Sequence, residues 1–535
     1  MSIRISALRM PLDFDANTLK AAAAKKLKIK AGQIQTLRLI KKSVDARKKD
    51  NVHFTVTVDI TTTLDEQTTV TRANDPAVTV PKPAPYILPP TVTTAQTPPV
   101  VVGSGPAGLF AALTLAKAGA CPILLERGRD VDARQRDVER FRKTGVLDPV
   151  SNVQFGEGGA GTFSDGKLNT GIKDPRCRHV LETLAAAGAP EEILWQAKPH
   201  VGTDKLRETI KNIRKQIENL GGKVLFEHTL TDIRTRNGAL SALLVNTPAG
   251  MLELPCEHAI FAIGHSADDT ARMLYAHGAP MEQKPFAVGV RIEHPRVMID
   301  QSQYGKFAGH PALGAADYKL NCRPKNGRGV YTFCMCPGGE VVAAASQNGR
   351  LVVNGMSEHA RAAENSNSAL LVGIGPEDFD TEHPLSGFDF QQKWEALAFK
   401  LGGNDFRAPA QLVGDFLQDR ASAVLGDIAP SYQPGVTLCD LRECLPPIVT
   451  ASLKSGLPIL GQQIKGFDRF DAVLTGIESR SSSPVRILRD QTTGQSALAG
   501  IYPCGEGAGY AGGILSAAVD GIKCAEWVLK ALCAS

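Results

Sequence analysis

VVVGSGPAGLFAALTLAKAGACPILLE, residues 100–126, is the stretch that decides the fold. Its first three residues are apolar on both faces, as a parallel strand buried beneath helices must be. Small and apolar residues then repeat at helical spacing from Pro106 to Lys117, and a second short apolar run follows at 123–125. The order strand, glycine turn, helix, strand predicts one β-α-β unit of a parallel sheet.

The turn of this unit is a G-x-G-x-x-G motif, which consists of Gly103, Ser104, Gly105, Pro106, Ala107 and Gly108. Gly103 permits the tight turn, Gly105 lets the backbone approach a pyrophosphate, and Gly108 lets the helix pack closely on the strand. The N–H groups at the start of the helix then face the phosphates. Glu126 ends the second strand, where a carboxylate accepts hydrogen bonds from an adenosine ribose, and this favours FAD or NAD over NADP.

Two further segments are too rich in glycine for the interior of a helix or strand: FGEGGAGTFSDGKLNTG at 155–171 and CGEGAGYAGGI at 504–514. Their backbone must therefore approach something closely. FAD is long, and its ribityl chain and ring need support beyond the first β-α-β unit. We expect the C-terminal segment to complete the first site, with a carboxylate near the ribityl chain and the positive end of a helix near the flavin ring. These features lie at Gly505, Glu506, Gly512, Gly513 and Ile514.

The remaining pattern divides the chain into domains. Prolines among Thr and Val indicate an extended linker, short strands between glycine turns indicate a mostly antiparallel domain, and Asn237-Gly238 indicates a hairpin. The expected units are a small basic α/β domain at 1–62, a Pro-rich linker at 63–98, the first part of an FAD-binding domain at 99–280, a substrate domain at 281–455 and the second part of the FAD-binding domain at 456–535.

Composition fits a soluble enzyme. The 535 residues are 43% hydrophobic and 21% charged, and no run approaches the roughly 18 apolar residues that a membrane span needs. The start lacks the pattern of a signal peptide, and eleven scattered cysteines fit reduced thiols. We therefore expect a cytoplasmic protein with no membrane partner and no bound metal.

Several longer blocks carry a family resemblance: GSGPAGLFAALTLAKAG, FGEGGAGTFSDGKL, PFAVGVRIEHP, CMCPGGEVV, VNGMS, ESRSSSPVRI and CGEGAGYAGGILSAAVDG. Together they resemble the bacterial family of FAD-dependent dehydrogenases, which are uncharacterised NAD(P)/FAD-dependent oxidoreductases among the glutathione-reductase-like flavoproteins. The resemblance covers nearly the whole chain. It implies an α/β protein in which a Rossmann-like FAD/NAD(P)-binding domain carries an inserted α+β substrate domain and a small N-terminal α/β domain of ferredoxin-like type.

The function that this resemblance implies is that of an FAD-dependent oxidoreductase, a dehydrogenase that transfers hydride between the flavin and an unidentified small organic substrate. The nucleotide-binding site is expected at Gly103, Ser104, Gly105, Pro106, Ala107, Gly108, Glu126, Arg127, Gly161, Thr162, Ser164, Asp165, Gly166, Lys167, Gly264, Gly505, Glu506, Gly512, Gly513 and Ile514. No second G-x-G-x-x-G directly follows a strand-like run and opens a helix as the first does. This leaves two sources of electrons open, a transiently bound NAD(P)H or the substrate itself.

Catalytic side chains are less defined, because the flavin carries the hydride chemistry. Lys167 is a candidate for stabilising negative charge on reduced flavin, although pairing with Asp165 explains it equally well. His265 and His294 are candidate acids or bases, although a structural histidine is the commoner outcome.

The cysteines give no clear redox motif. The C-x4-C pair of disulfide reductases is missing beside the first glycine motif, and the spacing of Cys439 and Cys444 is better explained as coincidence. Cys334 and Cys336 lie in a strand-like run, where buried thiols are the preferred interpretation over a metal or redox site.

The first fifty residues are strongly basic, with thirteen Lys and Arg against four Asp. The runner-up hypothesis is therefore a flavoprotein that binds or modifies RNA through this domain. Nucleic-acid surfaces usually add stacking aromatics, and only Phe14 and Phe54 are present in residues 1–60. A solvated face of charges is the preferred interpretation.

Overall fold

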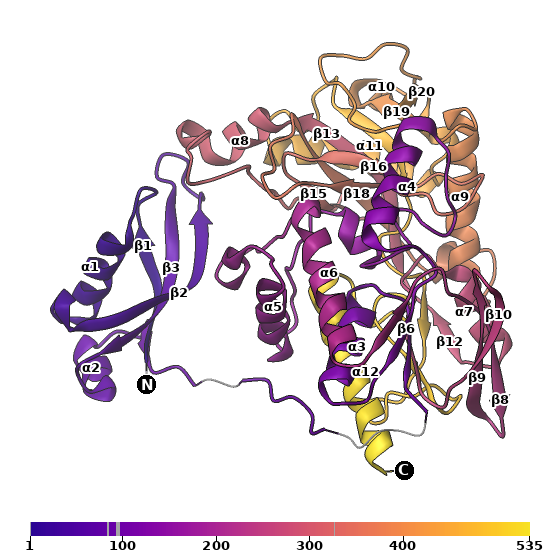
Figure 1. Ribbon diagram of the computed structural model, residues 1–535. Helices are drawn as coiled ribbons and strands as arrows, with labels where there is room; N and C mark the ends of the chain where they lie inside the picture. Colours follow the sequence, from indigo (N-terminus) through magenta and orange to yellow (C-terminus); the bar gives the residue numbers. More distant parts are fainter. Residues whose placement is uncertain (1, 83–84, 92–96, 326, 535) are drawn as a thin grey trace.

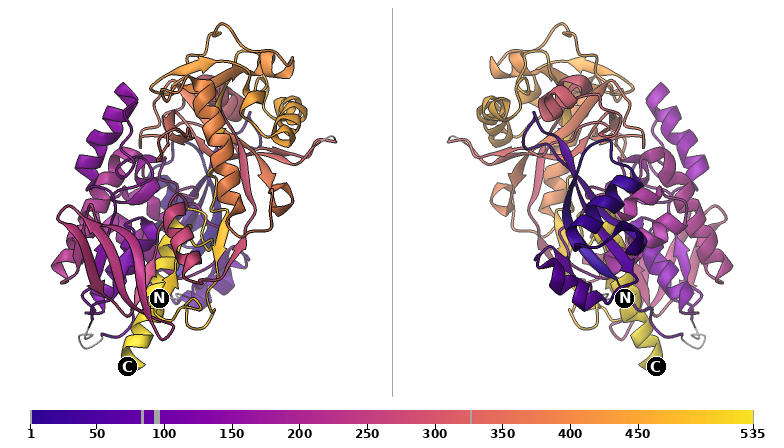
Figure 2. Two further views of the ribbon diagram at one scale, coloured as in Figure 1. Left: turned by 90° about the vertical axis from the view of Figure 1, so that its right-hand side faces the viewer. Right: turned by 90° about the vertical axis from the view of Figure 1, so that its left-hand side faces the viewer.

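The computed structural model describes residues 2–82, 85–91, 97–325 and 327–534 (Figure 1). Three parts are distinguished in Figures 1 and 2: a small N-terminal domain, a domain built on a parallel sheet, and a domain built on an antiparallel sheet that lies above it in Figure 1. The parallel sheet and the antiparallel sheet together form the cavity described below.

The parallel sheet has the order β23-β11-β5-β6-β7. Its central strand β5 (Val100–Val102) is fully apolar and leads through a glycine turn into α3 (Pro106–Lys117), as predicted. The other strands are β6 (Ile123–Leu125), β7 (Lys223–Leu225), β11 (Ala259–Phe261) and β23 (Ile501–Pro503), and all neighbours pair in parallel.

Two layers cover this sheet because side chains of each strand alternate between its faces. Val101, Leu124 and Ile260 pack against α3, α6 (Thr203–Asn219) and α12 (Ile514–Ala534). Val102, Leu125 and Phe261 pack instead against a three-stranded antiparallel sheet, which consists of β8 (Thr229–Arg236), β9 (Ala239–Thr247) and β10 (Gly250–Pro255). The predicted turn at Asn237-Gly238 joins β8 to β9 and is confirmed.

The strand order explains how distant segments of the chain meet. β23 pairs with β11, and β11 pairs with β5, although β23 begins about four hundred residues after β5. Since parallel strands end at the same edge of a sheet, the loops after β5, β11 and β23 leave that edge side by side. The first glycine turn and the C-terminal glycine segment are thereby brought together.

The antiparallel domain is built on a seven-stranded sheet of order β14-β15-β18-β13-β21-β19-β20. Every pair in it is antiparallel except β19 with β20. Helices α9 (Ser386–Gly402) and α11 (Pro447–Gln463) contribute to its hydrophobic core. The strands are β13 (Phe286–Pro295), β14 (Asn321–Cys322), β15 (Val330–Cys336), β18 (Asn365–Ile374), β19 (Ala408–Leu412), β20 (Val436–Leu438) and β21 (Val473–Glu478).

The boundary expected at residue 455 is wrong. α11 runs through it, and β21 lies inside the seven-stranded sheet beside β13. The chain passes between the two large domains through a two-stranded ribbon of β12 (Met281–Gln283) and β22 (Val485–Ile487). The second part of the cofactor domain therefore begins near β22. The prediction failed because the strand-like run VLTGIE does not reveal the sheet to which it belongs.

The N-terminal domain has the element order β-α-β-β-α-β and the sheet order β2-β3-β1-β4. Its elements are β1 (Ile3–Met10), α1 (Ala16–Leu27), β2 (Ile34–Asp45), β3 (His53–Thr62), α2 (Glu66–Ala73) and β4 (Val78–Thr79). The linker expected at 63–98 is thus wrong in its first part, because α2 and β4 complete this domain. Asp65 caps α2 by accepting from the N–H of Thr68 at 2.7 Å. Residues 83–84 and 92–96 of the expected linker lie outside the described residues.

The N-terminal domain is docked through the C-terminal half of β2. Lys42 exchanges two backbone hydrogen bonds with the segment beyond α5 (Arg176–Ala186), donating to Trp195 O at 2.7 Å and accepting from Ala197 N at 2.9 Å. Its ammonium lies 4.0 Å from the centre of the Phe54 ring. Burial lowers the pKa of Lys42. This lysine of the basic module therefore serves the interface between the domains.

The remaining helices and strands are α4 (Val131–Thr144), α7 (Asp268–Ala276), α8 (Arg296–Tyr304), α10 (Val413–Leu417), β16 (Glu340–Ala343) and β17 (Val353–Met356). Within the described ranges, no helix combines the length and apolar character needed to cross a bilayer.

Candidate functional site

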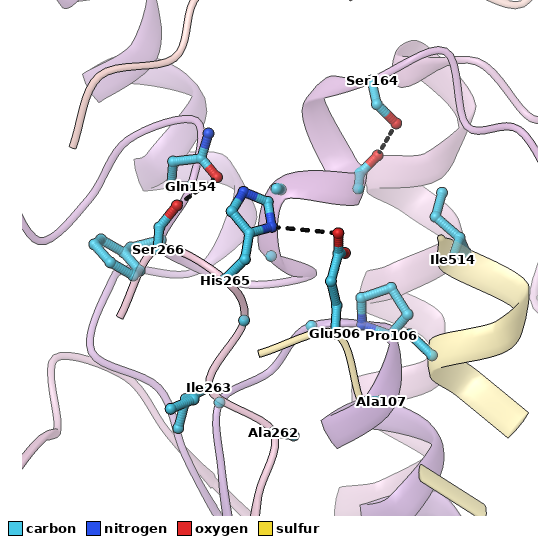
Figure 3. Close-up of a pocket in the computed structure, with 18 of the residues that line it drawn as sticks. Pro106, Ala107, Gln154, Ser164, Ala262, Ile263, His265, Ser266, Glu506 and Ile514 are labelled. Carbon is cyan, nitrogen blue, oxygen red and sulfur yellow. Dashed lines mark hydrogen bonds and ion pairs between the residues drawn. The ribbon is translucent and has the colours of Figure 1, made fainter. Parts of the chain in front are cut away.

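A cavity of about 380 Å³ lies at the edge where the parallel strands end (Figure 3). Its walls come from the loops after β5, β6, β11 and β23, from the glycine segment at 155–171, and from the antiparallel sheet. Of the residues expected to hold the nucleotide, those that line it are Gly103, Ser104, Gly105, Pro106, Ala107, Glu126, Arg127, Gly161, Ser164, Asp165, Gly166, Lys167, Gly264, Glu506, Gly512, Gly513 and Ile514.

The first glycine turn is set by close backbone packing. Gly103 has a φ of +96°, and a Cβ there would lie 2.4 Å from Ala262 O. A Cβ on Gly108 would lie 1.8 Å from Gly103 O. Gly108 is thus not a wall of the cavity but the contact that holds α3 against the turn. The helix then opens into the cavity at its N-cap, Gly105.

Glu126 holds the loops around the cavity together. Its carboxylate is buried, and it accepts four hydrogen bonds of 2.7–2.9 Å from Ser104 N and Oγ, Gly128 N and Gly156 N. These bonds tie the first glycine turn to the second glycine segment. Contact with a ribose stays a prediction, because these oxygens already have protein partners. Arg127, beside it, pairs with Asp269 at 3.0 Å and lies over the Phe155 ring.

The second glycine segment places opposite charges at the cavity wall. The carboxylate of Asp165 lies 2.9 Å from Lys167 Nζ and accepts from Arg361 at 2.5 and 3.0 Å. Burial acts to raise the pKa of Asp165, but the two cations outweigh it and hold the pKa below its usual value. Thr162 does not line the cavity. Its hydroxyl donates to Glu157 O at 3.2 Å and so stabilises the loop of the second glycine segment.

Lys167 is a cation that faces the cavity without a well-directed hydrogen bond. Burial favours its neutral form, but Cys336 and Asp165 raise its pKa above the usual value. Its Nζ has no hydrogen-bond partner among the described residues, although it forms the ion pair with Asp165. Lys167 thus forms the expected pair with Asp165 and also lines the cavity, while its role toward reduced flavin stays a prediction.

The loops after β11 and β23 form the opposite wall. His265 and Glu506 point toward each other across it, with Nδ1 3.5 Å from the carboxylate (Figure 3). The other ring nitrogen, His265 Nε2, is buried without a hydrogen-bond partner in the described part of the chain. A Cβ built on Gly264, Gly512 or Gly513 would meet no atom within 4 Å. These glycines leave bare backbone on the wall, as a closely held cofactor requires.

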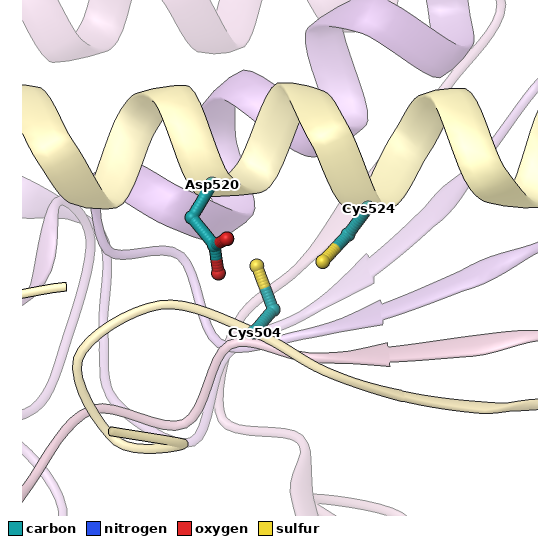
Figure 4. A group of neighbouring side chains, drawn as sticks. All are labelled: Cys504, Asp520 and Cys524. Atoms are coloured by element: carbon teal, nitrogen blue, oxygen red, sulfur yellow. The ribbon is translucent and has the colours of Figure 1, made fainter. Parts of the chain in front are cut away.

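A buried group behind this loop fastens it to α12 (Figure 4). Asp520 accepts from Gly505 N at 2.8 Å and from both terminal nitrogens of Arg489 at 2.6 and 2.9 Å. Ligand atoms of Asp520, Cys504 and Cys524 lie within 4.8 Å of one another, a spacing that could hold a metal. Arg489 already neutralises this carboxylate, so we assign the group to anchoring the loop. Gly505, which does not line the cavity, belongs to this anchor.

His294 is wrong as a catalytic candidate. It is fully buried in β13, where Nε2 shares a hydrogen bond with Phe467 O at 2.7 Å, and it does not line the cavity. Burial lowers its pKa to about 4, which keeps the ring neutral. His294 lies inside a strand, where the register of the sheet decides which groups surround the side chain. The sequence alone does not reveal that register.

The antiparallel domain contributes side chains to the cavity that the sequence analysis did not assign to the site: Phe333, Cys334, Asn354, Glu478, Arg480 and Ser481. Arg480 pairs with Glu395 at 2.8 and 2.9 Å, so its charge is already balanced. Gln154, Ser266 and Thr270 also line the cavity. Only contacts across the fold identify these residues, because no local motif surrounds them.

Comparison with known proteins agrees with this architecture. Residues 96–262 match the family model of an FAD binding domain, residues 285–481 match a FAD-dependent protein, C-terminal domain-like, and residues 2–61 match a domain of unknown function, DUF8436. An uncharacterized protein of Clostridium beijerinckii is 50% identical over 532 residues, which are 99% of each chain. The present chain belongs to the family of that protein. It is an FAD-binding flavoprotein, and the prediction of FAD as its cofactor is confirmed.

Solved structures that align with this flavoprotein are only distantly similar. The flavin-dependent brominase Bmp2 is 12% identical, with a TM-score of 0.38 over 83% of this chain and 80% of the other. A geranylgeranyl bacteriochlorophyll reductase-like protein of Thermoplasma acidophilum is 12% identical, with a TM-score of 0.37 over the same shares. The quinol fumarate reductase FrdA of E. coli is 12% identical, with a TM-score of 0.36 over 82% of this chain and 71% of the other.

The residues of the cavity fit FAD. The N-terminus of α3 offers backbone N–H groups to a pyrophosphate, and bare glycine backbone faces the cavity at Gly264, Gly512 and Gly513. Lys167 Nζ and His265 Nε2, which have no hydrogen-bond partner among the described residues, offer polar groups in the same space. The cavity is lined by residues from both matched ranges, 96–262 and 285–481.

Proposed function

We propose that this flavoprotein is an FAD-dependent oxidoreductase, a dehydrogenase that exchanges hydride with a small organic substrate. The observation that carries the proposal is the shared cavity: one end is formed by the loops of the parallel sheet, and the other by side chains of the antiparallel sheet. The first end suits the nucleotide. The second end, at Phe333, Asn354 and Glu478, is then the place for a substrate.

The chain's own residues have three tasks at this site. FAD, when bound, supplies a centre that accepts or donates hydride. Lys167 places positive charge on the wall, where it would favour a reduced, anionic cofactor. His265 and Glu506 form a pair that can hold a proton close to the same space. Phe333 offers an apolar ring to a substrate at the other end of the cavity.

The overall architecture supports the finer expectations of the proposal. A parallel sheet with helices α3 and α12 on one face is typical of Rossmann-like nucleotide domains and supports a place among glutathione-reductase-like flavoproteins. The β-α-β-β-α-β order of the N-terminal part supports a ferredoxin-like domain. A cytoplasmic location remains part of the proposal, together with NAD(P)H as a transient electron donor.

Anaerobic titration of the FAD-loaded protein with NADH and NADPH tests the proposal. Bleaching of the flavin absorbance by either nucleotide would support a reductive half-reaction in which NAD(P)H is the donor. If neither nucleotide reduces the flavin while dithionite does, a donor other than NAD(P)H is required and screening of reduced organic substrates follows. A flavin that no substrate reduces and no acceptor oxidises would contradict the oxidoreductase proposal.

A further inference from the structure

Two cysteines, Cys334 and Cys336, end β15 at the substrate end of the cavity. In a regular strand, residues two apart point to the same face. Here the pairing of β15 with β18 shifts between Phe333 and Cys336, and Cys334 has a φ of +42°. Such a bulge re-aims a side chain. As a result Cys334 lines the cavity, whereas Cys336 is fully buried directly behind it.

The two side chains are in contact. The Cys336 thiol donates to Cys334 O at 3.3 Å. The neighbouring Cys336 thiol lowers the pKa of Cys334 well below its usual value, with the charges of Lys167 and Arg291 acting in the same direction. Cys334 and burial raise the pKa of Cys336 well above its usual value. The pair therefore consists of one sulfur with thiolate character and one that keeps its proton.

The surroundings of the pair favour this asymmetry. Arg291 is fully buried, donates to Cys334 O at 2.9 Å and pairs with Glu478, which also lines the cavity. Lys167 lies on the cavity wall, where its ammonium pairs with Asp165 but has no well-directed hydrogen bond among the described residues. A partly exposed thiolate beside cations is the arrangement found at reactive cysteines, whereas structural buried cysteines are inert.

We propose that Cys334 and Cys336 form a reversible redox pair that exchanges two electrons with FAD bound in the same cavity. In the oxidising direction the Cys336 S–H bond breaks and one S–S bond forms between its sulfur and the Cys334 thiolate. The two electrons and the one proton go to FAD, which becomes the anion FADH−. The reverse reaction opens the disulfide and restores oxidised FAD, so no further oxidant or reductant enters the exchange.

Other cysteines of the chain are less suited to this exchange. Cys439 and Cys444 do not line the cavity, and burial raises the pKa of both. Cys504 also lines the cavity, but its side chain and that of Cys524 are fully buried, and burial raises the pKa of Cys504 well above its usual value, which keeps its thiol protonated. The proposal for Cys334 rests on the proposed function only in that FAD must occupy this cavity. The identity of the organic substrate does not enter it.

Reductive titration of the holoprotein tests the pair without measuring catalytic activity. The FAD-loaded protein is oxidised with ferricyanide, desalted and titrated with dithionite under argon. Wild type is expected to take up about four electrons per FAD, two for the flavin and two for the disulfide. Cys334→Ser and Cys336→Ser should each take up about two, whereas the control Cys439→Ser should still take up about four.

Mass mapping of wild type gives a second measurement that does not depend on the folding of a variant. The peptide that contains both cysteines should resist N-ethylmaleimide in the oxidised protein and take two labels after reduction. Uptake of about two electrons by wild type, or labelling of both cysteines in the oxidised protein, would overturn the proposal. So would persistence of the extra electrons in Cys334→Ser. Absence of bound FAD would instead contradict the proposed function.

Discussion

The substitution Gly512→Ala distinguishes an effect on FAD binding from an effect on the stability of the fold. A Cβ there would meet no protein atom within 4 Å, and Gly512 has no positive φ. Gly512→Ala should therefore leave the FAD-free protein as stable as wild type, or more stable by about 0.4–1 kcal/mol, because alanine restricts the unfolded chain. Gly512 lines the cavity assigned to FAD, so we expect the added methyl to conflict with the bound cofactor.

The expected cost appears only in cofactor binding. Overpacking by one methyl costs about 1–3 kcal/mol, which corresponds to a Kd for FAD that is roughly 5- to 150-fold weaker. Flavin fluorescence titration measures the Kd, and urea unfolding of the FAD-free protein measures stability. Gly32→Ala is the matched control, because its Cβ also meets nothing within 4 Å and it lies far from the cavity lining. An unchanged Kd for Gly512→Ala would refute the reasoning.

Three other substitutions test the rest of the account. Gly108→Ala should lower the free energy of unfolding by about 3 kcal/mol or more, because its Cβ would lie 1.8 Å from Gly103 O; stability within about 0.5 kcal/mol of wild type would contradict this. Asp520→Ala should lower the free energy of unfolding in urea by about 3–5 kcal/mol, because it leaves Arg489 buried without its partner. It should also weaken FAD binding, because Gly505 N loses its acceptor. A loss of stability with normal FAD affinity would show that the anchor does not position the loop. His294 has a pKa of about 4 in the fold against 6.5 as its usual value, so the unfolded chain binds the extra proton and stability falls as pH drops through this interval. His294→Gln keeps a donor for Phe467 O. This variant should reduce the loss of unfolding free energy between about pH 7 and pH 5 by about 2 kcal/mol. An unchanged pH dependence would show that His294 is not responsible.

Local patterns in the sequence were sufficient for the first β-α-β unit and for its partner loop. The helix predicted from Pro106 to Lys117 has these bounds in the structure, because a buried strand, a glycine turn and helical spacing specify it without help from distant residues. The C-terminal glycine segment was expected to complete the same site. It lines the same cavity, since β23 pairs with β11 beside β5.

Features that depend on strand register or on distant contacts were not predictable. The boundary at 455 failed because nothing in VLTGIE shows that β21 pairs with β13. Cys334 was interpreted as a buried strand thiol, yet a bulge turns it to the cavity. The linker from residue 63 failed for another reason: prolines dominated the pattern, and the capping signal of Asp65 at the start of α2 was overlooked.

A crystal structure of the FAD-loaded protein tests the central claim most directly, which is that two glycine segments far apart in the chain hold one cofactor. The account predicts that a single FAD contacts the turn at 103–108 with its pyrophosphate and the loop at 504–514 with its flavin half. FAD bound away from this cavity, or held by the first turn with its flavin ring outside the loop after β23, would contradict it.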